Sequence, residues 1–294
     1  HMIPSLPRPL WLRAGTVAYV LLFLLFLFLP LAIVAVFAFN DAPYPAPPWR
    51  GFTLDWFLGN AASGRRGLFA DTSLMRSLWT SVVVASWVTV LSVAVGTANA
   101  FLIERTQFRG KAALSLLMLA PLVIPGVILG ISILAFASQL AQFVENTWGL
   151  ELDVLRPGLP LVVLGQFSYI VSIATLTITA RLKRFDTTLE DAAYNLGASR
   201  FAVLRTITLP YLRPALVGSG AISFLMSFEN FNTTLMLVGS ESPLTVMMYG
   251  RMREGATPVL NAVSLFLMLA SAALALAFMR PGARDNKERD DGNL

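Results

Sequence analysis

The side chains that could do chemistry in this chain are carboxylates, amides and hydroxyls. The 294 residues include no cysteine, and the single histidine, His1, stands before Met2 and is typical of a residue left by cloning. These counts exclude a disulfide framework, a thiol nucleophile, a thiolate metal site, and catalysis or metal binding by histidine. The segment around Lys111 lacks the upstream glycine and the hydroxyl of a loop that binds ATP phosphates. We therefore expect no catalytic residue, no metal ligand and no cofactor bound by this chain.

Glu229 is the acid best placed to act on a small ligand. It lies near the middle of an apolar stretch, where a charged side chain costs at least ~2.5 kcal/mol. On a helical wheel it shares a face with Asn232 and Thr233. The functional hypothesis is that Glu229 lines a transport path and attracts a passing cation, with Phe228 or Phe231 available for a cation–π contact. The alternative is that Glu229 is hydrogen-bonded or ion-paired inside a helix bundle and holds a subunit interface.

The preceding apolar stretch carries two further polar candidates. Gln166 and Tyr169 lie three residues apart, so a helix places them on the same side. They could line the same path as Glu229. Polar pairs also commonly hold membrane helices together, and the sequence leaves both interpretations open.

The elements that carry these residues are membrane-spanning. The composition is 56% hydrophobic and 13% charged with a mean hydropathy of +0.67, which excludes a soluble enzyme. Six stretches reach the roughly 20 apolar residues that a spanning helix needs. They run from about Gly15 to Phe39, Leu78 to Ile103, Ala112 to Val144, Gly158 to Ala180, Pro214 to Val238 and Pro258 to Met279. Pro121 and Pro125 predict that the third is kinked or unwound. The sequence thus predicts an all-α polytopic membrane protein with six transmembrane helices.

The basic residues predict the orientation of the chain. Of the 22 lysines and arginines, 15 lie in the N-terminus, the second loop, the fourth loop with its borders and the C-terminal tail. The positive-inside rule then places both termini and the fourth loop in the cytoplasm. We expect a cytoplasmic N-terminus (1–14), a transmembrane domain (15–279) and a flexible cytoplasmic tail (280–294). This asymmetry accounts for the net charge of +5 without nucleic-acid binding.

The fourth loop is far longer than a connection between neighbouring spans requires. Thr187 with Glu190, or Thr188 with Asp191, has the spacing of a capping box that starts a helix, and Gly197 is expected to end it. Ser199 is expected to cap a second short helix. Further along, Pro210 and Pro214 are expected to stop that helix and restart the chain as the fifth span.

This loop resembles the signature of the membrane subunits of binding-protein-dependent ABC importers. The matching residues, at the family's spacing and in the expected loop, are Asp191, Ala192, Ala193, Gly197, Ile207, Leu209 and Pro210. The acid is Asp191 where glutamate is usual, and Glu190 precedes it. The resemblance implies a type I ABC importer permease fold in which residues 185–210, the coupling loop, dock into a cytoplasmic ATPase.

The resemblance also implies partners. These are a homodimeric ABC ATPase that holds ATP and Mg, a second homologous permease subunit, a periplasmic or extracellular solute-binding protein, and the lipid bilayer of a bacterial inner membrane. ATP hydrolysis is expected on the ATPase, so this chain is not expected to be an enzyme.

The segments "GFTLDWF" and "SFENFNTTLMLVGSESPLTVMMYGRMREGATPVLNAVS" are similar to the spermidine/putrescine branch of the superfamily. They imply a polyamine-type cation as solute. The alternative solute is another small molecule, such as an amino acid derivative or an opine.

Other membrane functions are less consistent with the sequence. A membrane hydrolase would need a second acid or a serine with a base near Glu229. A stand-alone secondary transporter, the second choice, is disfavoured by six spans, by the lack of an evident inverted repeat and by the coupling loop. A non-transporting scaffold leaves Glu229 and the kinked third span unexplained.

Overall fold

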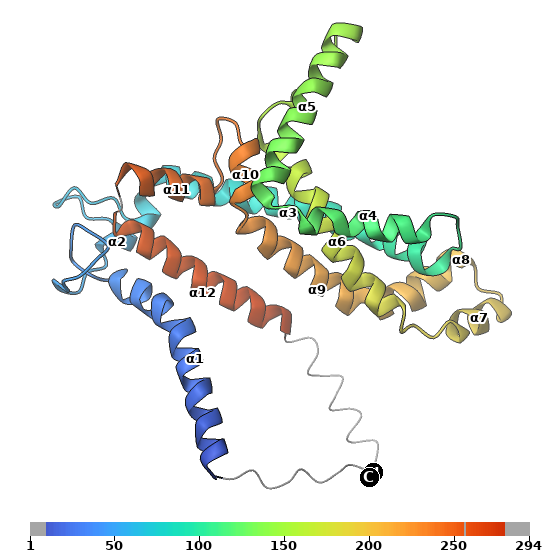
Figure 1. Cartoon of the computed structure of the whole chain (residues 1–294), viewed down its shortest axis with the longest axis horizontal. Coiled ribbons are helices and arrows are strands. Elements are labelled where there is room, and N and C mark those ends of the chain that lie inside the picture. Colours follow the sequence, from blue (N-terminus) through green and yellow to red (C-terminus); the bar gives the residue numbers. More distant parts are fainter. Residues whose placement is uncertain (1–9, 256, 280–294) are drawn as a thin grey trace. The chain divides into compact units, whose positions relative to one another are not determined.

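The computed structural model describes residues 10–255 and 257–279, and every regular element in these ranges is a helix (Figure 1). The predicted N-terminal segment lies mostly, and the predicted tail wholly, outside the described residues. The chain divides into two compact units. One comprises the residues up to Asp71 together with Arg251–Leu269, and the other comprises Thr72–Gly250 with Ala270 onward.

All six predicted apolar stretches are helical. Four helices in the described ranges are long and apolar enough to cross a membrane by length and composition: α1 (Leu10–Phe37), α3 (Thr72–Arg105), α5 (Gly126–Trp148) and α6 (Leu159–Leu182). The third stretch is divided into α4 (Lys111–Val123) and α5, as the prolines predicted. The fifth is divided into α9 (Leu209–Phe228) and α10 (Asn232–Leu237), a break that was not predicted, and the sixth is α12 (Val259–Met279).

Helices α3, α6 and α9 form the core of the second unit (Figure 1). Small residues let them approach closely, because a Cβ added at Gly96 of α3 would lie 3.0 Å from the Ala174 side chain of α6. Such contacts are typical of membrane helices, which gain little from apolar burial against each other. Figure 1 shows α7 (Thr188–Asn195) and α8 (Arg200–Val203) at one end of this core, with α5 and α10 toward the other.

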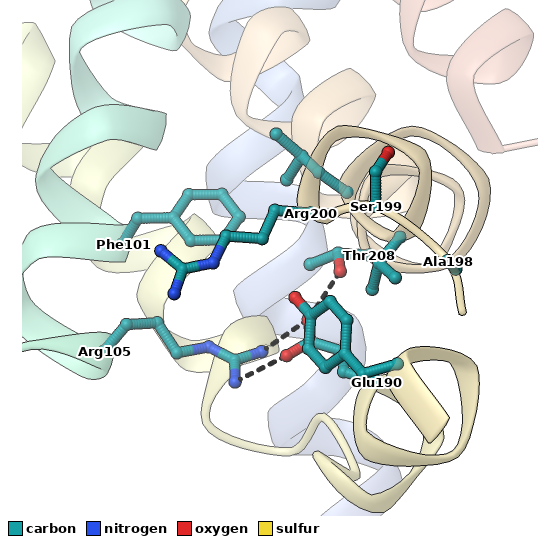
Figure 2. A pocket seen from close by; sticks show the side chains of 10 residues that line it. Phe101, Arg105, Glu190, Ala198, Ser199, Arg200 and Thr208 are labelled. Atoms are coloured by element: carbon teal, nitrogen blue, oxygen red, sulfur yellow. Dashed lines mark hydrogen bonds and ion pairs between the residues drawn. The ribbon is translucent and has the colours of Figure 1, made fainter. Parts of the chain in front are cut away.

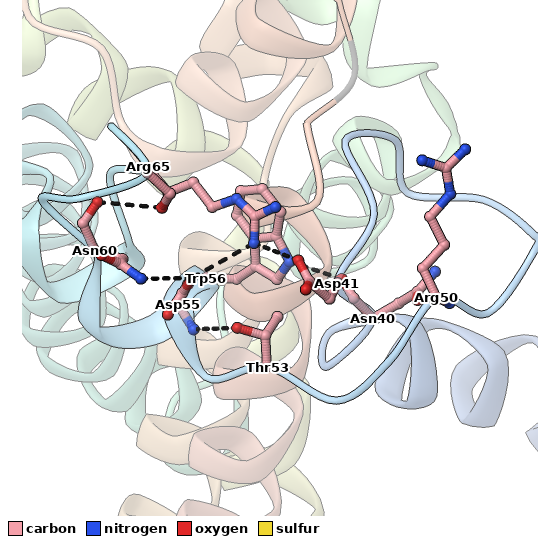
Figure 3. A network of polar contacts seen from close by, with 9 residues as sticks. Asn40, Asp41, Arg50, Thr53, Asp55, Trp56, Asn60 and Arg65 are labelled. Atoms are coloured by element: carbon pink, nitrogen blue, oxygen red, sulfur yellow. Dashed lines mark hydrogen bonds and ion pairs between the residues drawn. The ribbon is translucent and has the colours of Figure 1, made fainter.

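The first unit contains a loop, after α1, that is held by polar contacts (Figure 3). Residues 40–52 are non-helical and are followed by the short helices α2 (Asp55–Leu58) and η1 (Leu68–Ala70). Arg65 bonds Asp41 at 2.5 Å, lies 3.5 Å from Asp55 and covers the Trp56 ring at 4.8 Å. The Trp56 indole N–H donates to the Asn40 carbonyl at 2.8 Å. These side-chain contacts hold in place a segment that has little regular secondary structure.

The connection between the fifth and sixth predicted stretches contains a helix, α11 (Leu244–Glu254). It begins after Pro243, whose carbonyl accepts hydrogen bonds from Val246 and Met247. The sequence did not predict this helix because it is too short and too polar to register as a span. A short helix η2 (Asp153–Leu155) also lies in the loop after α5.

Candidate functional site

Two broken helices face each other in the second unit. The break between α4 and α5 lies at Ile124 and Pro125, and a cavity of about 440 Å³ lies between it, the α9–α10 break and α6. Thr233 of α10 donates its hydroxyl to the Gly126 carbonyl of α5 at 3.2 Å. The residues that line this cavity are Pro121, Leu122, Ile124, Gly126, Leu129, Tyr169, Ile173, Met226, Asn230, Asn232 and Thr233. Irregular backbone at membrane depth is tolerated where it lines a cavity, so this is the candidate translocation site.

The break in the fifth span corrects the helical-wheel expectation. Helix α9 ends at Phe228, and the chain resumes as α10 at Asn232, so the wheel drawn from Glu229 across to Asn232 and Thr233 is wrong. The cause is Asn230, whose Oδ1 accepts from the Thr234 N–H at 3.1 Å and from its hydroxyl at 2.8 Å. Thr245 donates to the Asn230 carbonyl at 2.9 Å. Side chains therefore satisfy backbone groups that a continuous helix would have paired.

Gln166 and Tyr169 differ in their surroundings. Gln166 is 1% exposed and does not line the cavity. Its Nε2 donates to the Thr234 hydroxyl at 2.8 Å, and its Oε1 accepts from the Ser227 hydroxyl. Tyr169 lines the cavity, and its hydroxyl accepts from Asn230 Nδ2 at 2.7 Å. The geometry thus favours a packing position for Gln166 and a lining position for Tyr169.

Glu229 lies at the C-terminus of α9, and its side chain is exposed. In the described part of the chain it has no hydrogen-bond or ion-pair partner, and it is not among the residues that line the cavity. Phe228 stacks on Phe224 at 5.9 Å, and Phe231 packs on Tyr249 at 4.9 Å. The structure therefore brings Tyr169, Asn232 and Thr233 into one cavity and leaves Glu229, Phe228 and Phe231 outside it.

The first short helix of the coupling loop starts and ends at defined caps. The predicted capping box is wrong: Thr187 makes no side-chain cap bond, and Asp186 instead accepts from the Thr188 N–H at 3.0 Å and hydroxyl at 2.7 Å. These two donors lower the pKa of the Asp186 carboxyl below its usual value. The predicted end at Gly197 is confirmed.

Gly197 has φ +86° and donates to the Tyr194 carbonyl at 2.9 Å, while Ala198 donates to the Ala193 carbonyl at 3.0 Å. This pair of bonds is a Schellman motif, which favours glycine at the left-handed position.

The second short helix does not stop at the prolines. Ser199 caps α8 by accepting from the Ala202 N–H at 3.3 Å, as predicted. The chain then passes through a π-helical segment, η3 (Leu204–Thr208), directly into α9. The prediction that Pro210 and Pro214 would stop the second helix is wrong, whereas the prediction that the fifth span begins here is confirmed, because α9 begins at Leu209. Pro210 lies in the first turn of α9, and the Leu209 N–H bonds the Leu204 carbonyl. The wider π turn accommodates the interruption of the helical hydrogen bonds that the prolines would otherwise cause.

The coupling loop carries three exposed apolar side chains. Leu189, Leu196 and Phe201 are 52%, 89% and 70% exposed, and no residue of α7 is buried. Asp191 and Ala192 are also exposed. Exposed apolar residues gathered on one loop are typical of a site that another protein covers.

Glu190 points the other way, into a cavity of about 750 Å³ between α3, α7 and η3 (Figure 2). Its carboxylate pairs with Arg105, at the end of α3, and with Thr208. The sequence did not single out Arg105 or Thr208. The available signals were a basic residue that ends an apolar span and a threonine within the signature.

This combination of facing helix breaks and an exposed loop between the fourth and fifth spans agrees with a sequence comparison. Residues 92–280 match the family described as "Binding-protein-dependent transport system inner membrane component". The chain belongs to this family. Its fold is therefore that of a type I ABC importer permease, as the resemblance implied.

Similar permeases have assigned solutes. The spermidine/putrescine permease PotC of Haemophilus influenzae is 27% identical over 252 residues, covering 85% of this chain and 90% of PotC. The putrescine permease PotI of Escherichia coli is 25% identical and covers 90% of this chain and 89% of PotI. A relative from Salmonella paratyphi A, whose name assigns it to 2-aminoethylphosphonate transport, is 28% identical and covers 89% of this chain and 94% of its own length.

Solved structures share the permease fold. A bacterial ABC transporter involved in the import of alginate contains a chain that aligns with a TM-score of 0.71 at 17% identity, covering 93% of this permease and 95% of that chain. The inward-facing MetNI methionine transporter aligns with a TM-score of 0.52 at 16% identity, over 70% of this permease and 93% of that chain.

Proposed function

We propose that this permease forms part of an ATP-driven import path for a small organic cation of polyamine type. An external solute-binding protein delivers the solute, and a second homologous permease subunit completes the path. A homodimeric cytoplasmic ATPase, which binds ATP and Mg, drives transport through the coupling loop. Membership in the binding-protein-dependent family supports the assembly, and similarity to PotC and PotI supports the solute class.

The cavity between the two helix breaks carries the transport proposal. Helix breaks near the middle of a membrane leave backbone carbonyls and amides able to meet a polar solute. Pro125 and Asn230 produce the two breaks, and Asn232, Thr233 and Tyr169 add amide and hydroxyl groups to the same cavity. Because α4 and α5, like α9 and α10, are separate segments, the cavity can open or close when either pair shifts. Alternating access is then a shift between two packings of these segments.

Glu229 supports a cationic solute. A carboxylate at membrane depth is costly unless it meets water or a cation, and the described side chains of this chain offer it no cation. At ~4 Å and an effective dielectric of about 20, attraction to an ammonium is about 4 kcal/mol before desolvation. That is enough to favour entry of a cation without trapping it. In the complete transporter, Glu229 faces either the solute path or the second subunit. Replacing Glu229 distinguishes these two locations.

The test is Glu229→Gln, which removes the charge and keeps the shape. If Glu229 meets the solute, uptake of radiolabelled putrescine by the reconstituted transporter falls while the complex stays assembled and its ATPase still responds to the loaded binding protein. If it pairs with the second subunit, assembly or thermal stability is lost instead, because a partner charge is left uncompensated. Glu254→Gln, at an exposed acid in α11, is the matched control. Unchanged putrescine uptake by Glu229→Gln contradicts the proposed cation contact.

A zwitterionic solute is the second candidate, favoured by another cavity in the same unit. About 560 Å³ in volume, it is lined by Arg76 and Glu241 together with hydroxyls of α3 and the loop after α10. Neither charged residue has a partner among the described side chains. An arginine suits a phosphonate and a carboxylate suits an ammonium, which matches the aminophosphonate named for one relative. The solute that the binding protein selects distinguishes the two candidates. If the binding protein selects 2-aminoethylphosphonate, and uptake of that compound is lost in Arg76→Gln, the zwitterionic solute is supported and the polyamine is excluded.

A further inference from the structure

Glu190, the acid beside the family signature, is turned into the fold. Its Oε1 accepts from Arg105 Nη2 at 3.1 Å and its Oε2 lies 3.0 Å from Arg105 Nη1, so the pair is bidentate (Figure 2). The Thr208 hydroxyl donates to the same Oε1 at 2.5 Å. The Glu190 side chain is 14% exposed and Thr208 is 1% exposed. One carboxylate therefore joins α7 to the end of α3 and to η3.

Little else attaches α7 to the core. None of its residues is buried, so apolar packing contributes little to its position. Within the described ranges, Glu190 is the only α7 residue whose side chain hydrogen-bonds or ion-pairs with another helix. A bidentate arginine–carboxylate pair fixes direction as well as distance, because both partners are planar. The orientation of α7 relative to α3 thus depends on this contact.

Thr208 is the last residue of the π-helical segment η3. Four threonines of α3 and α6 donate their hydroxyl to the carbonyl four residues earlier: Thr89, Thr97, Thr175 and Thr177. For Thr208 that carbonyl belongs to Leu204, which accepts from the Leu209 N–H. The Thr208 hydroxyl bonds Glu190 instead. The π turn between the coupling loop and α9 therefore ties the start of the fifth span to α7.

Ring contacts extend the link into the core. The Arg105 guanidinium lies 5.4 Å from the centre of the Phe185 ring, which packs edge-on against Tyr211 at 5.0 Å. The Arg181 guanidinium lies over the Tyr211 ring, 4.2 Å from its centre. A continuous set of contacts thus runs from α7 through α3 to α9 and α6.

We propose that the Arg105–Glu190–Thr208 contact transmits movement of α7 to α3 and α9, and that Arg105 and Thr208 are positioning residues for coupling. Glu190 is then not the acid presented to the ATPase. Asp191, exposed and without a partner among the described side chains, takes that position. The inference rests on the function proposed above, since it names the part of this chain that carries the movement.

The test is a charge exchange in the complete transporter. Glu190→Gln and Arg105→Gln each lower the uptake of radiolabelled putrescine at least about tenfold, equivalent to about 1.4 kcal/mol of coupling. The assembled complex keeps its abundance and still hydrolyses ATP. The double variant Glu190→Arg with Arg105→Glu recovers most of the lost uptake, because it restores the pair with reversed polarity. Arg109→Gln, at an exposed arginine of the same α3–α4 connection, is the matched control and keeps wild-type uptake. A double variant as impaired as the worse single variant overturns the proposal, as does wild-type uptake by Glu190→Gln.

A distance measurement on the full chain alone separates this inference from the proposed function. Spin labels at Asn195→Cys in α7 and Leu102→Cys in α3 can be introduced without background, because the chain has no cysteine. In lipid nanodiscs, the distance distribution between them broadens in Glu190→Gln and narrows again in the charge exchange, whether or not the chain transports anything. A narrow distribution in Glu190→Gln overturns the link itself. A broadened distribution with unchanged uptake shows that the link exists and carries no coupling.

Discussion

At the scale of single residues, partners decide what a polar side chain in a span does. The sequence identified Gln166 and Tyr169 as a pair and could not separate them, since spacing gives only a shared side of one helix. The difference comes from residues that are distant in sequence: Ser227 and Thr234 enclose Gln166, whereas Tyr169 borders open space. Which of two neighbouring polar residues lines a cavity therefore depends on packing that no local pattern contains.

Replacing Gln166 by leucine tests the packing position. The change keeps a side chain of similar size and leaves the Thr234 hydroxyl without a donor and the Ser227 hydroxyl without its acceptor. Hydrogen bonds between membrane helices are worth roughly 1 kcal/mol, so we expect a modest fall in the free energy of unfolding and a lower melting temperature. Thermal unfolding of the purified full chain, followed by tryptophan fluorescence, measures it. Asn232→Ala, at an exposed side chain, should melt like the wild type. Equal melting of Gln166→Leu and wild type would contradict the packing position.

At the scale of elements, helix ends set by local chemistry were predictable and those set by distant side chains were not. The break at Pro125 and the end at Gly197 follow from a missing N–H and from a left-handed turn. The break after Phe228 has neither proline nor glycine and depends on Asn230 and on Thr245 from α11. The helix through Pro210 continues because a π turn, which sequence patterns do not reveal, absorbs the irregularity.

The Schellman turn gives a prediction for the coupling loop. Gly197→Val should lower uptake about five- to thirtyfold, because a β-branched residue at positive φ costs ~1–2 kcal/mol and the end of α7 loses its fixed direction. ATP hydrolysis and abundance should change little. Apart from the chain neighbours of Gly197, no heavy atom of the described residues lies within 4 Å of the position a Cβ would occupy, so the effect is due to the backbone rather than a clash. Gly197→Asn is the control, since asparagine tolerates this conformation and should retain most uptake. Normal solute uptake in Gly197→Val would contradict the prediction that coupling requires a left-handed backbone conformation at position 197.

At the scale of the whole molecule, composition and charge were informative because membrane insertion acts on them directly. The six apolar stretches are all helical, and half of the apolar window of α6 is buried, which makes it a central helix of its unit. Their arrangement could not be predicted, since small residues such as Gly96 determine contacts only after the helices meet. The uneven distribution of basic residues, with 15 of 22 on one side of the predicted topology, still yields a direct experiment.

Introduced cysteines test the orientation on which coupling depends. The positive-inside rule places Ser63 and Ser242 outside the cell and Thr188 in the cytoplasm. An impermeant maleimide should therefore label Ser63→Cys and Ser242→Cys in intact spheroplasts, and Thr188→Cys only after permeabilisation. Thr188 and Ser63 are exposed, so a lack of labelling there reflects the membrane barrier rather than burial. The unsubstituted chain, which contains no cysteine, sets the background. Labelling of Thr188→Cys from outside would place α7 and the Arg105–Glu190 pair on the face opposite to ATP, and a cytoplasmic ATPase could then not act through the coupling loop.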